Sequence, residues 1–225
     1  AHREHIILSV LLACVGYAFY NIGDAALKMM AGKFHFSQIF FYNAIVIIVF
    51  MVMYGWKRDG ISSLRTKKPG LLFIRALLAQ VISICNIYAF PHIHLTTFYT
   101  LVFTSPFWVA LLSAYFLDDK LDRRRMMAIL AGLSVILFIF RPGGGLLNIW
   151  AVLVLLSAFF YSCQMVLVRH ISASESRPFM IITGSVMSLI IAVPLLPFHY
   201  VEPTLYEWGL FLLMGLTGSI GLLCI

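Results

Sequence analysis

The sequence predicts an all-α membrane protein, a bundle of transmembrane helices, and three observations support this. The chain of 225 residues is 62% hydrophobic and only 11% charged. Its mean hydropathy of +0.97 lies above the range of soluble domains. Apolar runs of about 20 residues follow one another along the whole chain, and we expect each to be long enough to cross a bilayer as a helix. Because the hydrocarbon core offers the backbone no water, each run should form a helix.

Eight apolar runs define the expected helices in chain order. They are residues 6–26, 39–56, 71–90, 95–117, 126–140, 149–168, 179–198 and 205–225. The connections between them are short, so we expect no catalytic domain outside the membrane. All four cysteines lie within the runs, which argues against a disulfide framework. The last run is still apolar where the sequence stops, and we expect this span to be cut.

Basic residues are distributed unevenly between alternate connections. Thirteen lie before or near the runs on one side of the predicted bundle, against three on the other, namely Lys28, Lys33 and Arg141. Cytoplasmic connections of membrane proteins carry the excess of lysine and arginine, so this pattern predicts a multi-pass protein with a cytoplasmic amino terminus. The net charge of +7 is thereby explained as a topology signal, and no nucleic-acid partner is predicted.

The chain also contains a weak internal repeat. Sliding it along itself by 141 residues aligns the first run with the sixth, including Phe19-Tyr20 with Phe160-Tyr161, and an offset of 140 aligns the second and third runs with the seventh and eighth. A period of five runs is odd, so the second copy enters the membrane from the opposite side. Inverted repeats of this kind are typical of secondary transporters. We predict repeats over 1–145 and 146–225, the second incomplete and truncated in span 8 of an expected ten.

Residues 103–143, FTSPFWVALLSAYFLDDKLDRRRMMAILAGLSVILFIFRPG, carry the most specific pattern. They resemble the EamA family of the drug/metabolite transporter superfamily, and the resemblance covers nearly the whole chain. Family members have a proline-kinked fourth helix, matched by Pro106, an acidic-basic turn, matched by Asp119-Lys120, a glycine in the fifth helix, matched by Gly132, and a closing Arg-Pro-Gly from Arg141.

The first helix resembles the family too, because Asp24 is followed four residues later by Lys28. Two departures are visible: Asp118-Asp119 stands where Gly-Glu is usual, and Asn43 where many relatives carry arginine. The resemblance implies ten spans in two repeats, a location in the bacterial cytoplasmic (inner) membrane, and transport of amino acids, S-adenosylmethionine, riboflavin or similar metabolites.

Polar residues recur at one depth in the first four runs and on one stripe of the sixth, which predicts a shared cavity rather than scattered polar positions. The predicted substrate-binding residues are Tyr20, Asp24, Asn43, Asn86, Tyr99, Thr104, Trp108, Tyr161 and Gln164. Simpler interpretations stay open: membrane threonines often bond their own backbone, Lys28 can extend to the interface or pair with Asp24, and the aromatic residues can be packing residues.

The leading functional hypothesis is a secondary transporter that moves a small polar molecule by alternating access, with an integral membrane enzyme and a non-transporting assembly protein as alternatives. An enzyme would need a nucleophile, a base or a metal cluster at membrane depth, and the two histidines of the Pro91–His94 turn lack a nearby carboxylate. No GxxxxGK[ST] motif occurs. We predict no cofactor and no metal. The expected partners are the substrate, the lipid bilayer and a coupling proton, and homodimerisation is left open.

Overall fold

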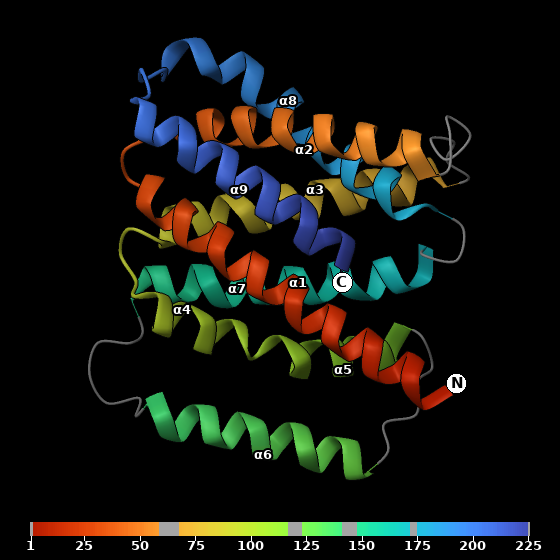
Figure 1. The fold of residues 1–225 in the computed structure, drawn as a ribbon. Coiled ribbons are helices and arrows are strands. Elements are labelled where there is room, and N and C mark those ends of the chain that lie inside the picture. The colour runs from red at the N-terminus through yellow and green to blue at the C-terminus, as the bar shows by residue number, and fades with distance from the viewer. Residues whose placement is uncertain (1, 59–67, 117–122, 141–147, 172–174, 225) are drawn as a thin grey trace. The chain divides into compact units, whose positions relative to one another are not determined.

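Helices account for almost all of the chain that the computed structural model describes, which is residues 2–58, 68–116, 123–140, 148–171 and 175–224. In chain order these are α1 (His2–Met30), α2 (Phe36–Arg58), α3 (Pro69–Ala89), α4 (Leu95–Val102), α5 (Ser105–Phe116), α6 (Arg123–Phe140), α7 (Ile149–Ile171), α8 (Arg177–Leu195), the 3₁₀ helix η2 (Leu196–Phe198) and α9 (Leu205–Cys224) (Figure 1). No strand occurs among these residues. The predicted all-α class is confirmed.

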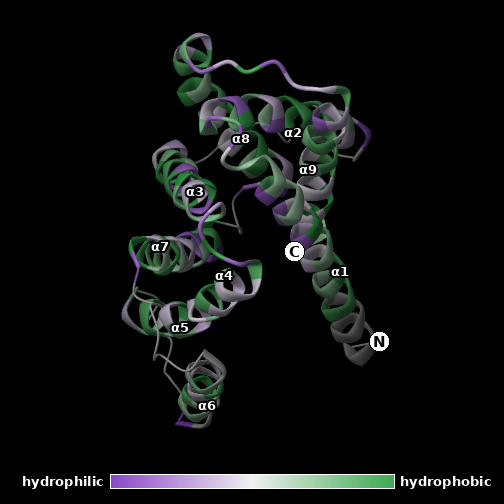
Figure 2. Ribbon diagram, turned by 90° about the vertical axis from the view of Figure 1, so that its left-hand side faces the viewer, coloured by the Kyte–Doolittle hydropathy of each residue, from purple (hydrophilic) through white to green (hydrophobic). Residues whose placement is uncertain are grey.

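Seven segments of the described chain are long and apolar enough to cross a membrane. They correspond to seven of the eight predicted runs, with α4 and α5 together forming the fourth. Figure 2 shows these helices coloured mainly as hydrophobic along their lengths. The first helix is longer than expected, because α1 continues to Met30 instead of ending near residue 26. Asp24 and Lys28 therefore both lie inside α1.

The remaining predicted run forms α6, which is not among the seven. Three arginines open this helix, and its apolar part, Met126–Phe140, is shorter than the others. At a rise of about 1.5 Å per residue, such a segment reaches roughly 20–25 Å, less than a hydrocarbon core of about 30 Å. The crossing expected for this run stays a prediction.

The helices form two compact units. Unit 1 comprises residues 1–72 and 174–225, and so contains α1, α2, α8 and α9; unit 2 comprises residues 73–173, and contains most of α3 together with α4 to α7. Each unit thus combines helices from both predicted repeats. The repeat division at residue 145 remains a prediction.

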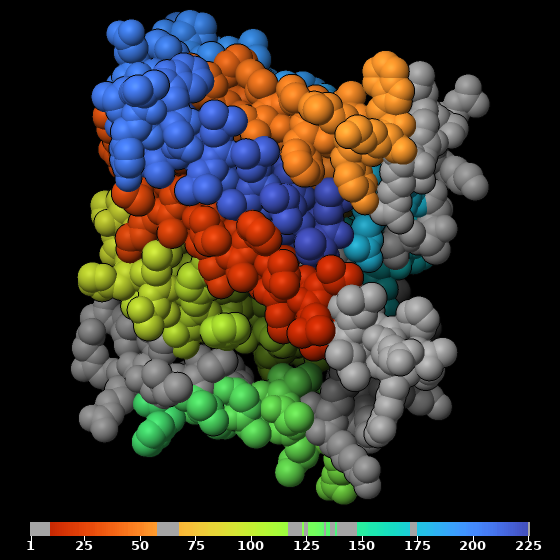
Figure 3. All heavy atoms as spheres, in the orientation of Figure 1, coloured from red at the N-terminus to blue at the C-terminus, as the bar shows by residue number. Residues whose placement is uncertain are grey.

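In unit 1, α1 packs antiparallel against α9, and Figure 3 shows the two helices side by side. Small residues bring them close together. A Cβ on Gly221 would lie 2.7 Å from the ring of Tyr20 and 3.0 Å from the carbonyl oxygen of Gly16, while a Cβ on Gly23 would lie 3.0 Å from Oγ1 of Thr217. Glycine is common where membrane helices approach closely, because association there depends on packing.

Helix α2 packs against both α8 and α9. Ile47 and Met51 of α2 form a buried cluster with Ile181 of α8. On the side toward α9, a Cβ on Gly215 would lie 2.5 Å from Cγ1 of Val46. These contacts fix α2 between two helices that follow it by more than a hundred residues in the sequence.

Polar contacts join the connections at each of the two ends of unit 1. An ion pair between Lys33 and Glu207 joins the α1–α2 connection to the start of α9 at one end. At the other end, the backbone N–H of Lys68 donates to Oε1 of Glu175 at 3.1 Å, which joins the start of α3 to the segment before α8. The start of α3 and the segment before α8 thus lie at the same end of unit 1.

Candidate functional site

The fourth span is interrupted close to its middle, between the end of α4 at Val102 and the start of α5 at Ser105. Pro106 explains the break, because proline has no N–H to donate to the carbonyl of Val102 and its ring disfavours helical geometry at the preceding residue. The chain makes a tight turn instead, in which the N–H of Thr104 donates to the carbonyl of Leu101 at 3.1 Å. The kinked fourth helix implied by the family resemblance is confirmed, as a full break.

Helix α7 packs against the helices on both sides of the break, α4 and α5. The hydroxyl of Ser162 lies 3.0 Å from the carbonyl oxygen of Ser105, at the start of α5, and 2.8 Å from the carbonyl of Ala158 in its own helix. The hydroxyl of Ser162 therefore has two acceptors within reach of its one proton: the carbonyl of Ala158 in α7 and the carbonyl of Ser105, the first residue of α5. Ser162 is fully buried. One turn after the break, Trp108 of α5 packs edge-on against Phe159 of α7, with ring centroids 5.4 Å apart.

Five predicted site residues lie in unit 2, on the helices that flank this break or pack against it. Tyr99 precedes it by one turn on α4, Thr104 forms it, Trp108 follows it by one turn on α5, and Tyr161 and Gln164 flank Ser162 on α7. Gln164 is buried, and the other four are partly buried. These five residues thus lie on the three helices α4, α5 and α7, and their action as one site stays a prediction.

The threonine hydroxyls of the fourth span bond their own backbone. Thr100 Oγ1 donates to the carbonyl of Thr96 at 2.8 Å, and Thr104 Oγ1 donates to the carbonyl of Leu101 at 2.7 Å. This is the simpler interpretation left open by the sequence. Because the hydroxyl proton of Thr104 is used in this bond, Thr104 can only accept a hydrogen bond from a ligand, through its oxygen lone pairs.

The other predicted residues are distributed over three helices. Tyr20 and Asp24 lie on α1 and Asn43 on α2, all in unit 1, whereas Asn86 lies on α3 in unit 2. The ring of Tyr20 rests against Gly221 of α9. Asp24, one turn further along, is partly buried and interacts with another residue, as Lys28 does. Whether these residues act together with those around the break stays a prediction.

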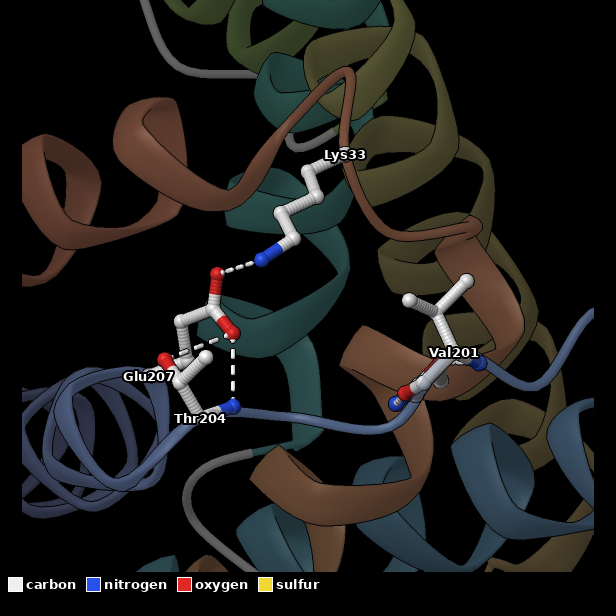
Figure 4. A network of polar contacts seen from close by, with 5 residues as sticks. Lys33, Val201, Thr204 and Glu207 are labelled. Atoms are coloured by element: carbon white, nitrogen blue, oxygen red, sulfur yellow. Dashed lines mark hydrogen bonds and ion pairs between the residues drawn. The ribbon is translucent and has the colours of Figure 1, made fainter.

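A polar network at one end of unit 1 was missed at the sequence level (Figure 4). Glu207 pairs with Lys33, and its Oε2 accepts hydrogen bonds from the N–H and the hydroxyl of Thr204 at 2.8 and 2.9 Å. The sequence contains the signal for half of it, because Thr204 and Glu207 have the spacing of a capping box before an apolar run. The partner Lys33 lies 174 residues away, which no local pattern reveals.

Two further contacts join the same two connections. Gln38 bonds the backbone of Val201 twice, through Nε2 to the carbonyl at 2.6 Å and through Oε1 to the N–H at 3.0 Å. His35 stacks on His199 with ring centroids 4.0 Å apart. Burial, together with the nearby His199, lowers the pKa of His35, so its imidazole is neutral at pH 7. The α1–α2 and α8–α9 connections are thus held together as part of one compact unit.

Removing Glu207 is expected to destabilise the protein more than removing Lys33. Glu207→Ala loses both the ion pair and the cap of α9, whereas Lys33→Met loses only the ion pair and leaves the carboxylate bonded to Thr204. Thermal unfolding of the purified protein in detergent measures the difference. Equal melting temperatures for the two variants would show that the cap contributes nothing.

The turn between α3 and α4 gives one of its histidines a packing role. His92 stacks on Trp150, the second residue of α7, with ring centroids 3.8 Å apart and planes inclined by 13°. Within the described part of the chain, no three histidine, cysteine, aspartate or glutamate side chains cluster as metal ligands would.

Comparison with known proteins places these features in a family. A model described as the EamA-like transporter family matches residues 6–141. The chain is 28% identical over 216 residues to a pseudopaline exporter of Pseudomonas aeruginosa, covering 94% of this chain and 75% of that protein. It is 21% identical over 204 residues to an S-adenosylmethionine uptake transporter of Rickettsia bellii, covering 89% and 68%.

A riboflavin transporter of Brucella anthropi is 26% identical over 166 residues, covering 74% of this chain and 58% of that protein. The three named relatives carry different molecules, and both export and uptake are represented. The family match extends over more than half of the chain and includes the broken fourth span. The chain is a multi-pass bacterial membrane protein and belongs to the EamA-like transporter family.

Proposed function

We propose that the protein is a secondary transporter that moves a small polar metabolite across the cytoplasmic membrane by alternating access. The observation that carries the proposal is the break in the fourth span. Membrane helices are rarely interrupted at this depth, because a freed backbone carbonyl needs a partner, and transporters use such breaks to bind their substrates. Here the break lies against α7, whose Ser162 hydroxyl donates to the carbonyl of Ser105, the first residue after the break.

The residues around the break have the chemistry to bind a polar molecule. They provide two phenols, an indole, an amide and a threonine oxygen, in Tyr99, Tyr161, Trp108, Gln164 and Thr104. Aromatic rings bury apolar or cationic parts of a ligand, while the polar groups fix its orientation. No nucleotide-binding motif is present in the sequence, which favours an ion or solute gradient as the energy source.

In unit 1, we propose that Tyr20, Asp24 and Asn43 also contact the transported molecule during the cycle, and that Asp24 either contacts it directly or carries the coupling proton. The named relatives support the general class of cargo, since their printed names include S-adenosylmethionine and riboflavin.

Transport of a panel of metabolites into and out of vesicles that contain the intact protein tests the proposal. The panel includes S-adenosylmethionine, riboflavin and amino acids, and an imposed proton gradient is present or collapsed. We expect gradient-dependent movement of at least one member. Uphill movement of the metabolite that continues unchanged after collapse of every ion and solute gradient would contradict secondary transport.

The amino terminus is proposed to be cytoplasmic, because of the 13 to 3 distribution of basic residues. In a cysteine-free background, His94→Cys is expected to react with an impermeant maleimide added outside, and Arg123→Cys is not. Both positions are exposed, whereas Ile93, in the same turn as His94, is 6% exposed and would label poorly on either side. Labelling of Arg123→Cys but not of His94→Cys would mean that the amino terminus lies outside the cytoplasm.

A further inference from the structure

Two histidines face each other where the α1–α2 connection of unit 1 meets the α8–α9 connection. His35 and His199 stack with ring centroids 4.0 Å apart and planes inclined by 13°. His35 immediately precedes α2, and His199 follows η2, so both lie outside the membrane-spanning segments. Nδ1 of His199 lies 3.4 Å from the carbonyl oxygen of Leu195, a contact that the imidazole keeps when it is charged.

The imidazole of His35 also caps the amino-terminal end of α2. Its Nδ1 accepts from the backbone N–H of Ser37 at 3.4 Å and lies 2.9 Å from the hydroxyl oxygen of the same residue. Ser37 is fully buried, and its N–H is among those that begin a helix without a partner inside the helix. A ring nitrogen that accepts carries no proton, so neutral His35 has its proton on Nε2.

A second proton on His35 conflicts with this arrangement in three ways. A protonated Nδ1 is a donor and can no longer accept from Ser37. The charge lies at the amino-terminal end of α2, where the helix already carries a partial positive charge. It also lies against the second imidazole, that of His199. Burial first, and then His199, lower the pKa of His35. The stacked arrangement therefore favours a neutral His35.

The other charged groups at this end of unit 1 do not offset a charge on His35. Glu207 is paired with Lys33 (Figure 4), Glu202 is exposed, and neither carboxylate is among the causes that act on the pKa of His35. The remaining titratable side chain of the α8–α9 connection is Tyr200, and a phenol carries no charge near neutral pH. Helices α2, α8 and η2 contain no acidic residue.

We propose that His35 and His199 form an acid-sensitive latch, which holds the α1–α2 and α8–α9 connections together while His35 is neutral and releases them when His35 takes up a proton. In the released form His35 is free to bind its proton near the ordinary value of 6.5, whereas the latched form binds it only at lower pH. The latch is therefore fully closed above about pH 6.5 and is lost progressively as the pH falls below this value. In the orientation proposed above, it responds to the pH outside the cytoplasm.

Hydrogen–deuterium exchange of the intact protein in detergent, at pH 7.5 and pH 5.5, tests the latch. Two amides report directly on it: the N–H of Ser37, bonded to His35, and the N–H of Val201, bonded to Oε1 of Gln38. Protection factors, corrected for the intrinsic exchange rate at each pH, are expected to fall by up to about 10-fold at pH 5.5 in peptides that cover residues 34–40 and 199–204. No substrate is present, so the result is independent of the transport function.

Three variants assign the acid response to the stacked pair. His35→Asn keeps a side chain that caps α2 but does not titrate, so its protection should no longer depend on pH. His199→Phe keeps a ring on His35 and removes the second imidazole, so the response should become smaller. His94→Asn is the matched control: His94 also immediately precedes a helix, α4, but its side chain makes no capping bond, and this variant should respond as wild type does.

Equal corrected protection of the wild-type protein at the two pH values would overturn the inference. So would an undiminished acid response in His35→Asn or in His199→Phe, or loss of the response in His94→Asn. Size-exclusion profiles identify a variant that fails to fold; His35→Ser, which also caps without titrating, then replaces His35→Asn and has the same expected result.

Discussion

Asp24→Asn is expected to abolish transport, or to change which molecule is carried, while the protein still inserts and folds. Asp24 is partly buried inside α1, one turn from a tyrosine that packs on α9. A carboxylate within a membrane helix costs about 2.5–3.5 kcal/mol of insertion free energy, and such residues are generally retained for function. Asparagine has nearly the same shape but no charge. A lost charged hydrogen bond corresponds to roughly a 10- to 100-fold lower initial rate in vesicles.

The matched control for Asp24 is Glu202→Gln, which removes an exposed acidic residue outside the spans. This variant should transport at the wild-type rate. If Asp24 carries the coupling proton, Asp24→Asn will still exchange substrate across the membrane but will not respond to a proton gradient. If Asp24 binds the substrate directly, both exchange and gradient-driven transport are lost. Wild-type rates for Asp24→Asn in both assays would refute a role in either step.

Gly215→Ala is expected to lower the stability of the protein by about 1–3 kcal/mol, because it overpacks the contact between α9 and α2. The added Cβ would lie 2.5 Å from Cγ1 and 2.6 Å from Cβ of Val46, which is too close for any side-chain rotation of Val46 to relieve. The two helices must therefore separate. Thermal unfolding in detergent should show a lower melting temperature.

Two variants separate this clash from a general effect of replacing glycine. Gly218→Ala lies on the same helix, where a Cβ would meet nothing within 4 Å. Because alanine favours the helix more than glycine does, this control should leave the melting temperature unchanged or raise it. Val46→Gly combined with Gly215→Ala moves the small residue to the other helix and should recover much of the loss. A Gly215→Ala protein as stable as wild type would mean that α2 and α9 are less closely packed than described.

The sequence was sufficient to predict the helices because a membrane span has a strong local signal. Seven of the eight runs form helices long and apolar enough to cross a membrane, and α6 is not among them because three arginines lie within its 18 residues. The break at Pro106 could also be predicted, since its cause lies in one residue. The end of α1 could not, because Asp24 and Lys28 interrupt the apolar run without interrupting the helix.

Contacts between distant helices were outside the reach of sequence reasoning. Thr204 and Glu207 have a recognisable capping pattern, but nothing near Lys33 indicates that its partner follows 174 residues later. The candidate residues were chosen by depth and helical stripe. That choice placed five candidates on α4, α5 and α7, but a stripe does not distinguish a tyrosine that binds a ligand from one that packs on a neighbouring helix, as Tyr20 does on Gly221.

The division of the chain has a consequence for biosynthesis. Unit 2 is one continuous stretch, residues 73–173, whereas unit 1 is assembled from both ends of the chain. As the ribosome delivers α1 and α2 to the membrane, Lys33 and Gln38 have been made, but Glu207 and Val201 have not. Unit 2 can pack as soon as α7 is inserted, while the first two helices wait in the bilayer for the last two. A chain arrested before α8 would therefore hold a finished unit 2 beside a pair of unpartnered helices, the form that membrane quality-control proteases are expected to recognise.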